Sequence, residues 1–539
     1  MKTPKLNSQS LITVTYLAIA LALMVLMAIG LGLRLYDLTD QPIDFHPTRQ
    51  LRSAIIARGM YYRMLPETSP STVPDQQTRQ QAIAAWNSVG QYEPSILEYL
   101  VAQSYRLMQG ENLWVARIWN SLFWLIGGLA LFDLARRGVL QATGAAQKDA
   151  PPPSPGIRSH QTAAIGAALV ALGYYLILPF AVQASRSFQP DPGMVMWLIL
   201  SAYSFYRWSE KQDWKWAILA GLFGGISVLT KFVAAYILGV VAITMVLYTL
   251  GLKRFWRSRQ VWVMAALLVT PTLLFYLNRQ GRASEYFQDW TISLSHLLIQ
   301  PDFYVRWLSL VQNLMGLTVL ILSLVGVLIA ASRYRALLAS LWGGYFLYGL
   351  FLPYQMYTHS YYHLQLVPII ALSLAPLAGL ILSRVQQEKS VWKIIFAAIL
   401  LIGLLYPAWV SIATFKSADY RGEGEHWQQI ASLLPDDGAI IALTQEYGYP
   451  LMYYGQRKVA LWPNRGERSL AELRGSNKEF EELFSNRVEG KSYFLITAFN
   501  QFDDQPELKQ ALAEGYPVLA EGDGYLIYDL QNPLPAQNP

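Results

Sequence analysis

The sequence predicts a polytopic α-helical membrane protein that ends in a small α/β domain. Three observations lead to this fold class. Only 14% of the 539 residues are charged, whereas soluble domains carry roughly 25%. Apolar runs near the ~20 residues that a helix needs to cross a bilayer recur between residues 11 and 413. From about Ser417 onward the composition becomes that of a soluble protein.

The apolar part is expected to hold about eleven membrane spans. The first run is too long for a cleavable signal peptide and lacks a small-residue cleavage site. The predicted spans are 11–36, 112–135, 161–182, 191–208, 214–230, 232–251, 260–277, 306–331, 335–352, 363–384 and 391–413. This pattern predicts a transmembrane domain, residues 1–416, with a long first outer loop, 37–111, followed by an accessory domain, residues 417–539.

The charges of the short loops predict the orientation. Lys and Arg gather in alternate loops, for example Arg136 with Arg137 and Arg254 with Arg257, and are sparse in the loops between. Because such loops face the cytoplasm, the N-terminus is expected inside, and the first outer loop and the C-terminal domain outside, a cell (inner) membrane.

The first outer loop has two helical candidates. One, 47–65, interleaves arginines with apolar residues, a pattern typical of a helix in the lipid headgroup plane. The other, 94–108, is too polar to span the membrane, and we expect it to be interfacial as well.

Helical and strand patterns alternate in the C-terminal part, which predicts an α/β domain with a largely parallel sheet. The predicted helices are 423–434, 449–454, 469–484 and 505–515, and the strands are 438–444, 458–462, 492–497 and a pair within 518–528. No Gly-rich phosphate loop or nucleophile elbow interrupts this pattern, so an accessory role is favoured.

Composition excludes several kinds of site. The chain has no Cys, which excludes disulfides, thiolate metal sites and a cysteine nucleophile. A metal would need His and carboxylate ligands, and only 6 His are present. The net charge of +6 does not indicate a nucleic-acid partner, because membrane proteins collect Lys and Arg in cytoplasmic loops.

Five polar clusters fall on the predicted outer side. Each has an ordinary explanation as a helix cap, a snorkelling lysine or part of an aromatic belt. Ionisable groups at membrane depth are costly, however, so their gathering on one side favours a shared site. The clusters are Pro42–Arg52, Tyr92–Pro94, Ala184–Pro192, Leu229–Phe232 and Tyr354–His363.

The cluster Pro42–Arg52 is the densest of the five. It places Asp44, His46, Arg49 and Arg52 beside a predicted helix whose first turn accommodates a proline. A capped, solvated loop is the ordinary alternative, and no role follows for His46.

Carboxylates beside cations at a membrane face suit an anionic lipid headgroup and an acceptor that gives up a proton. A departing phosphate needs fixed positive charge, and an acceptor hydroxyl needs a carboxylate to take its proton. Enzymes that use sugars linked to polyprenyl phosphate require this combination.

The clusters, in this order and placement, resemble the membrane glycosyltransferases of the GT-C fold, of the protein mannosyltransferase and aminoarabinose transferase type (glycosyltransferase family 39 and relatives). The resemblance covers about residues 11–413. Two features depart from it: some relatives have Glu-Lys-Pro where this chain has Glu93-Pro94, and His46 is atypical.

The resemblance implies an inverting transfer of a hexose or pentose from a polyprenyl-phosphate donor to a glycan, lipid or protein hydroxyl. Asp44 would be the general base and Asp191 the second carboxylate of the site. The implied phosphate-binding residues are Arg49, Arg52, Arg186, Lys231 and His363, and those near substrate or metal are Glu93, His46, His359 and Tyr362.

No cofactor is required by this reading, although carboxylate and imidazole groups suit a divalent cation, with Glu93 and His359 as candidate ligands. A transporter or flippase of lipid-linked sugars is the first alternative, and Gly224, Gly225 and Pro179 are weak hints of its broken helices. A non-catalytic scaffold is the second, but it leaves the polar clusters unexplained.

Overall fold

The structure is a computed structural model that describes residues 8–66, 75–90, 93–142, 155–278, 287–435, 438–476 and 478–535. The chain forms two compact units. The first unit comprises residues 1–38, 92–96 and 116–417, and the second comprises 39–91, 97–115 and 418–539. Most of the predicted first outer loop therefore belongs to the same unit as the C-terminal residues.

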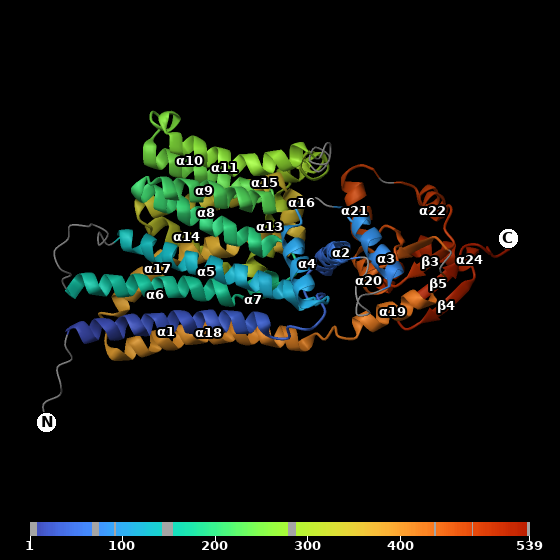
Figure 1. Ribbon diagram of the computed structural model, residues 1–539, viewed down its shortest axis with the longest axis horizontal. Coiled ribbons are helices and arrows are strands. Elements are labelled where there is room, and N and C mark those ends of the chain that lie inside the picture. The colour runs from blue at the N-terminus through green and yellow to red at the C-terminus, as the bar shows by residue number, and fades with distance from the viewer. Residues whose placement is uncertain are drawn as a thin grey trace, which may run out of the picture. The chain divides into compact units, whose positions relative to one another are not determined.

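The first unit is helical (Figure 1). Its elements are α1 (Ser8–Leu35), α5 (Trp114–Ala142), α6 (Pro155–Ile177), α7 (Pro179–Arg186), α8 (Asp191–Lys211), α9 (Trp214–Thr230), α10 (Ala234–Leu250), α11 (Arg259–Leu277), α13 (Pro301–Met315), α14 (Leu317–Ile329), α15 (Ser332–Phe351), α16 (Pro353–Thr358), α17 (Leu366–Val385) and α18 (Ser390–Ser417), with short helical turns η1 (Phe255–Arg257), η2 (Gln288–Ile292), η3 (Ser295–Ile299) and η4 (Ser360–His363).

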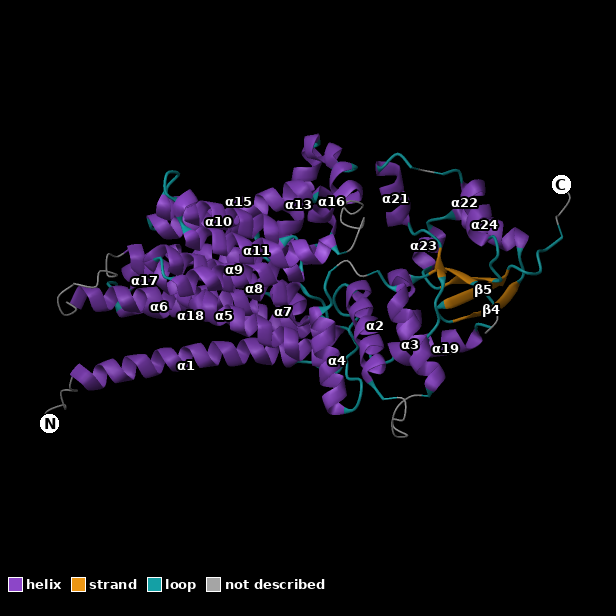
Figure 2. Cartoon of the chain, turned by 45° about the horizontal axis from the view of Figure 1, so that its top comes forward, coloured by secondary structure: helices purple, strands orange, loops and turns teal. Residues whose placement is uncertain are grey.

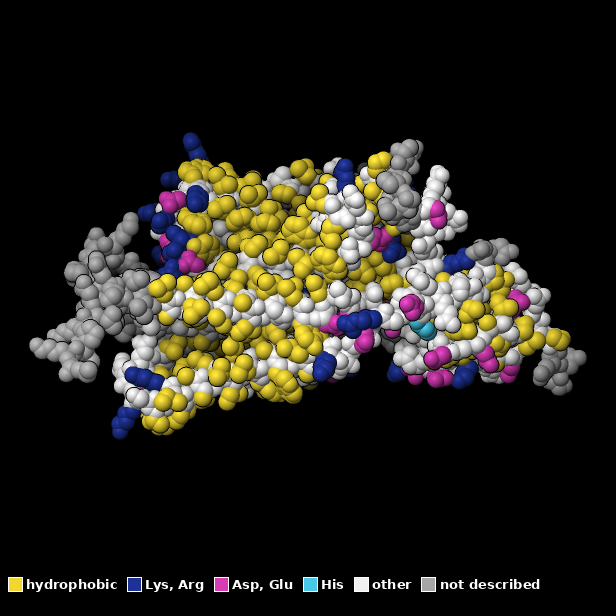
Figure 3. All heavy atoms as spheres, turned by 60° about the horizontal axis from the view of Figure 1, so that its bottom comes forward, with side chains coloured by type: hydrophobic (Ala, Val, Ile, Leu, Met, Phe, Trp, Pro, Cys, Tyr) yellow, Lys and Arg dark blue, Asp and Glu magenta, His cyan; other side chains and the backbone are white. Residues whose placement is uncertain are grey.

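The protein is an integral membrane protein. Among the described residues, six helices are long and apolar enough to cross a bilayer, or up to seven if the pair α13 and α14 forms one span. The two shorter helices α9 and α10 are also apolar. Hydrophobic side chains cover most of the face of this unit seen in Figure 3, as expected for a surface in contact with lipid.

Two predicted spans are broken by local backbone chemistry. The prediction of a continuous helix over 306–331 is wrong, because α13 and α14 meet at 94°. Gly316 lies at the bend with φ of +86°, a conformation that glycine adopts at little cost. The span predicted at 161–182 ends at Ile177, and Pro179 starts α7 in the first-turn position where proline needs no N–H partner.

The second unit contains three helices from the loop between α1 and α5, namely α2 (Pro47–Met64), α3 (Gln76–Ser88) and α4 (Ile96–Met108). Helix α2 was expected to lie in the lipid headgroup plane with its apolar side toward lipid, but that side is buried in protein. Leu51, Ile55 and Ile56 are at most 2% exposed, and α2 packs against α3 and α20 of the same unit. Its apolar face is thus part of a protein core.

The remainder of the second unit is a five-stranded sheet with helices (Figure 2). The strands are β1 (Ile440–Leu443), β2 (Ala460–Leu461), β3 (Tyr493–Ile496), β4 (Val518–Gly522) and β5 (Tyr525–Asp529), and the helical elements are α19 (Glu423–Leu433), η5 (Gln445–Gly448), α20 (Tyr449–Tyr454), α21 (Arg465–Leu473), α22 (Phe480–Val488), α23 (Phe499–Asp503) and α24 (Pro506–Gly515).

The strand order is β2-β1-β3-β5-β4. Strands β2, β1 and β3 are parallel, whereas β5 pairs antiparallel with both β3 and β4. The sheet is therefore mixed, not largely parallel as expected, because a tight hairpin joins the last two strands. The predicted helix 469–484 is two helices, and Gly475 between them has φ of +67°.

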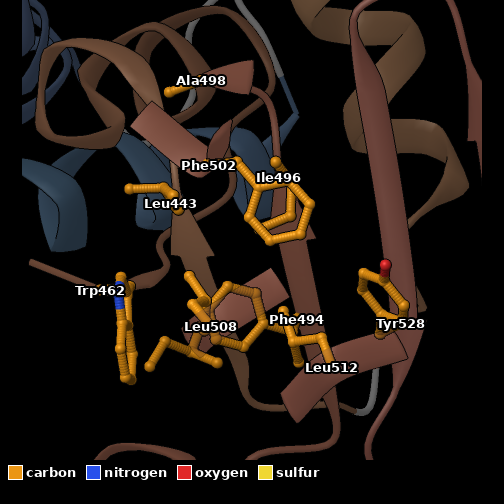
Figure 4. Packing of buried hydrophobic residues seen from close by; sticks show 10 residues of the cluster. Leu443, Trp462, Phe494, Ile496, Ala498, Phe502, Leu508, Leu512 and Tyr528 are labelled. Carbon is orange, nitrogen blue, oxygen red and sulfur yellow. The ribbon is translucent and has the colours of Figure 1, made fainter. Parts of the chain in front are cut away.

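Alternate strand residues build two cores, one on each face of the sheet. Leu443, Phe494 and Tyr528 pack on the face shown in Figure 4, with Leu508 of α24 and Phe502 of α23 in the same cluster. The other face holds Ile440, Leu495 and Ile527 with Trp427 of α19 and Leu451 of α20. Both faces of β1 and β3 are covered, so these two strands read as continuous hydrophobic runs in the sequence, whereas the edge strand β4 is largely exposed.

Candidate functional site

A buried ion pair lies where helices α8 and α9 meet in the first unit. The Lys231 Nζ is 2.7 Å from the Asp191 Oδ1, and the two residues are 3% and 1% exposed. Asp191 is the first residue of α8 and Lys231 directly follows α9. A carboxylate at a helix start and an ammonium at a helix end both interact favourably with the helix dipole.

Two aromatic rings also lie close to Lys231. Its Nζ lies 5.0 Å from the ring centroid of Tyr361 and 4.6 Å from that of Tyr362. An ammonium over aromatic faces is attracted by the ring quadrupole. The structure thus brings together Asp191, Lys231 and Tyr362, which the sequence supplied from three separate motifs.

His363 follows these tyrosines but is engaged on both sides. Its Nδ1 is 2.7 Å from the Tyr345 hydroxyl and its Nε2 is 3.0 Å from the Met356 carbonyl oxygen. A carbonyl can only accept, so Nε2 is the donor there. The indole of Trp307 in turn donates to the Tyr345 hydroxyl at 3.2 Å. His363 is therefore held in a buried chain of hydrogen bonds.

His359 and Glu93 are both half-buried residues of the first unit. The His359 Nδ1 lies 2.7 Å from the Thr358 hydroxyl oxygen. Among the described residues, no group of three or more His, Asp or Glu side chains is arranged to hold a metal ion. Within the described residues, Glu93 and His359 are therefore not part of a three-residue metal-binding group. Tyr92, which precedes Glu93, lies outside the described residues.

Arg186 contacts the carboxyl end of α1. It donates to the carbonyl oxygens of Tyr36 and Asp37 at 2.6 and 2.9 Å. Arg117 donates to the carbonyls of Asp37 and Leu38 at 3.2 and 2.8 Å. These three carbonyls belong to the residues directly after α1, which ends at Leu35, and buried backbone carbonyls need hydrogen-bond partners. These two arginines therefore stabilise the backbone of the segment that follows α1.

Arg34 adds a third buried guanidinium to the first unit. Its Nε donates to the Ser185 hydroxyl at 2.7 Å, and it also donates to the Leu176 carbonyl at 2.9 Å. Neither Arg34 nor Arg117 was singled out from the sequence. The available signal was their position within or beside long apolar runs, where a charge is costly and is kept for a reason.

Asp44, His46, Arg49 and Arg52 belong to the second unit. The Gln50 side chain donates to Asp44 at 3.1 Å and to the Phe45 carbonyl at 2.7 Å. Asp44 itself is half-buried. Arg52 donates to the Gly90 carbonyl, and Arg49 is half-buried on the same helix, α2.

His46 precedes α2 with φ of +47° and makes no side-chain cap bond to that helix. The first turn of α2 is capped instead by Glu446, whose carboxylate accepts from the Thr48 N–H at 3.0 Å and from the Thr48 hydroxyl. No local pattern indicates this contact, because 398 positions separate the two residues.

The two units offer different chemistry. In the first unit, the desolvated ammonium of Lys231 can stabilise a nearby anion strongly, because its buried surroundings screen charge little. In the second unit, the half-buried carboxylate of Asp44 can act as a proton acceptor.

Comparison with known proteins supports this architecture. Residues 162–276 match the sequence profile of a family described as "Dolichyl-phosphate-mannose-protein mannosyltransferase". That segment contains Arg186, Asp191 and Lys231. Among curated proteins, none matches the sequence of this chain.

Solved structures with a similar fold include ArnT from Cupriavidus metallidurans bound to undecaprenyl phosphate, with a TM-score of 0.54 and 15% identity over 94% of this chain and 97% of that one. The apo form of the same protein gives a TM-score of 0.53. The oligosaccharyltransferase from Archaeoglobus fulgidus gives 0.52, with 12% identity over 95% of this chain and 74% of that one. The predicted GT-C-like membrane fold is confirmed by these similarities.

Proposed function

We propose that this chain is an inverting glycosyltransferase that moves a sugar from a polyprenyl-phosphate donor to an acceptor hydroxyl at the outer face of the membrane. One observation carries the proposal. The segment that matches the mannosyltransferase family, 162–276, also supplies the buried Asp191–Lys231 pair. Support for the lipid donor comes from the similar fold of ArnT, which was solved with undecaprenyl phosphate bound.

The proposal places the N-terminus in the cytoplasm and residues 37–111 and 417–539 outside a cell (inner) membrane. Helix α8 supports this orientation, because Asp191 stands at its start and Arg207 near its end. Arg207 pairs with Glu210 at 2.9 Å, and Arg137 also contacts Glu210 at 3.7 Å. Basic residues gathered at one end of a helical unit mark the cytoplasmic side.

Asp44 is the proposed general base. It removes the proton of the acceptor hydroxyl, whose oxygen then attacks the anomeric carbon from the face opposite the phosphate. The bond between that carbon and the phosphate oxygen breaks, and the electron pair leaves with the polyprenyl phosphate. A single displacement of this kind inverts the configuration at the anomeric carbon.

Lys231 is the proposed main contact of the departing phosphate. It is already desolvated, so little reorganisation is needed when negative charge develops, and one such group contributes about 10²–10³ in rate. Asp191 holds the ammonium in place at 2.7 Å. The phenol of Tyr362, whose ring faces the same ammonium, lies within the proposed substrate region.

The other predicted residues take secondary places in the proposal. Arg49 and Arg52 of α2 are candidates for further contacts with the phosphate. Arg186 and His363 already donate to backbone carbonyls, which favours a supporting role. Glu93, His46 and His359 are kept as residues near the substrate, and Glu93 and His359 as candidate ligands of a divalent cation. Residues 1–416 would carry the chemistry, and 417–539 would form an accessory domain.

The test is a reconstitution assay. The full-length protein in liposomes would be given polyprenyl phosphates that carry a hexose, a pentose or an amino sugar, together with envelope glycolipids as acceptors. We expect release of polyprenyl phosphate and a new glycoconjugate with one of these donors. Movement of intact donor across the bilayer without release would instead indicate a flippase and would contradict the proposal.

A further inference from the structure

We infer that Glu446, in the turn after strand β1, is a positioning residue that holds the catalytic carboxylate Asp44 through the first turn of helix α2. The inference rests on the proposed function, because it assumes that Asp44 is the base. It gives the C-terminal domain a direct part in the reaction. All the residues involved lie in the second unit.

The first observation is that α2 depends on Glu446 for its cap. The residue before α2, His46, has a left-handed backbone and makes no side-chain bond to the first turn. Glu446 fills this place by accepting from both the N–H and the hydroxyl of Thr48. Hydrogen bonds to an ionised acceptor are stronger than neutral ones, and a carboxylate is favoured at a helix N-terminus.

The second observation is the backbone of the turn itself. Glu446, Tyr447 and Gly448 have φ of 52°, 58° and 71° in succession. This region is natural for glycine but uncommon for Glu and Tyr. An unfavourable backbone conformation of this kind persists only where surrounding contacts hold it, and such conformations are common at functional sites. The turn presents the Glu446 carboxylate to α2.

The third observation links the cap to Asp44. Gln50 lies two positions after Thr48 at the start of α2, and its side chain is fully buried. It donates to Asp44 at 3.1 Å and to the neighbouring Phe45 carbonyl at 2.7 Å. A shift of the first turn therefore moves Gln50, and with it the donor that orients the carboxylate.

Other contacts of the C-terminal domain hold the same segment. The Tyr420 N–H lies 3.1 and 3.3 Å from the two carboxylate oxygens of Asp40. The Tyr454 hydroxyl donates to the Gln41 side chain at 2.9 Å. Burial raises the pKa of Tyr420, and the negative charges of Asp44 and Asp40 raise it further, in keeping with their closeness. The segment that carries Asp44 therefore makes several hydrogen bonds with the C-terminal domain.

The test compares Glu446→Ala with a matched control, Glu467→Ala, in the full-length protein. Glu467 is a second cap in the same unit: its carboxylate accepts from the Asn464 N–H at 3.0 Å at the start of α21. We expect kcat to fall about tenfold for Glu446→Ala, because small displacements of a reacting group cost up to ~10²-fold. Donor KM should stay within about twofold, since uniform binding is untouched. Glu467→Ala should keep the wild-type kcat.

A double variant provides a measurement that general destabilisation would not change, namely whether the two substitutions have additive effects on kcat. If Glu446 acts through Gln50, the kcat of the double variant Glu446→Ala/Gln50→Ala should be close to the kcat of the single variant Gln50→Ala. If Glu446→Ala fails to fold, Glu446→Gly serves in its place, because glycine suits the left-handed turn while the carboxylate is lost.

Three outcomes would contradict the inference, and they differ in what they leave standing. Full turnover of Glu446→Ala beside an inactive Asp44→Asn variant would overturn the positioning role alone. Full turnover of Asp44→Asn would overturn the proposed base, and the inference with it. Equal losses in Glu446→Ala and Glu467→Ala would also contradict the inference, because they would indicate a general effect on stability.

Discussion

The two carboxylates assigned to the reaction are held in opposite ways. In the first unit, Asp191 faces a charged partner, Lys231, and both are almost completely buried. In the second unit, Asp44 is half-buried and accepts from the neutral amide of Gln50. A paired, desolvated carboxylate is suited to fixing a cation, whereas a more accessible one with a neutral donor is suited to meeting an acceptor hydroxyl.

This difference predicts that the two sites respond differently to substitution. Removing half of an ion pair leaves a buried charge behind, so stability and activity should fall together. Removing a neutral donor should change mainly the orientation of the carboxylate.

Lys231→Ala should destabilise the protein by about 3–5 kcal/mol, because Asp191 would lose its buried ammonium partner. It should also abolish measurable transfer. The double variant Asp191→Asn/Lys231→Met removes both charges and should recover most of the stability without activity. Thermal unfolding in detergent and the donor-release assay measure the two effects. Wild-type turnover by the double variant would make the pair a purely structural feature.

Gln50→Ala should lower kcat about tenfold, a loss equivalent to ~1.4 kcal/mol, because Asp44 loses a donor that orients it. Its stability cost should be about 1–3 kcal/mol, since the buried Phe45 carbonyl loses the same amide. A matched comparison is Gln505→Ala, another buried glutamine of the same unit whose side chain also donates to a backbone carbonyl, that of Pro463. If both variants lose kcat equally, the link between Gln50 and Asp44 has no special part in turnover.

Arg186→Ala and Arg117→Ala should have similar effects, each a loss of about 1.5–3 kcal/mol of stability, because each arginine donates charged hydrogen bonds to two carbonyls. Donor KM should change little, and equally, in the two variants. A KM that rises tenfold in Arg186→Ala alone would place Arg186 on the donor phosphate and return it to the role first expected from its motif.

Asn464→Ala should have the smallest effect, about 1 kcal/mol of stability, because it removes one side of the capping box of α21. Transfer should be unchanged at a temperature where the protein is folded. Loss of activity in this variant would mean that any destabilisation of the C-terminal domain impairs the reaction. It would contradict a specific positioning role for Glu446.

Features with a local cause were predicted well. Helix α2 begins at Pro47 as expected from first-turn proline, and α9 and α20 have the predicted bounds. Helix α3 was missed, because its residues show no clear apolar stripe and only Ala82 is buried among them. The break at Gly316 was missed because the apolar pattern continues across it.

The site shows the same division. Asp191 and Lys231 could be predicted because both stand at helix ends that a two-helix hairpin must bring together. The contact of Glu446 with Thr48 could not, since pairing across 398 positions leaves no local pattern. Likewise, nothing in the run at Arg186 reveals that its guanidinium donates to the end of α1.

Asp44 is proposed to be the base of a sugar transfer from polyprenyl phosphate. The most direct measurement is release of polyprenyl phosphate by the folded Asp44→Asn variant in liposomes, beside Asp75→Asn, which changes a cap of α3 in the same unit. We predict a loss of about 10²–10⁴-fold for Asp44→Asn, the range of general base catalysis, and none for Asp75→Asn. Turnover of Asp44→Asn at the wild-type rate would contradict the account.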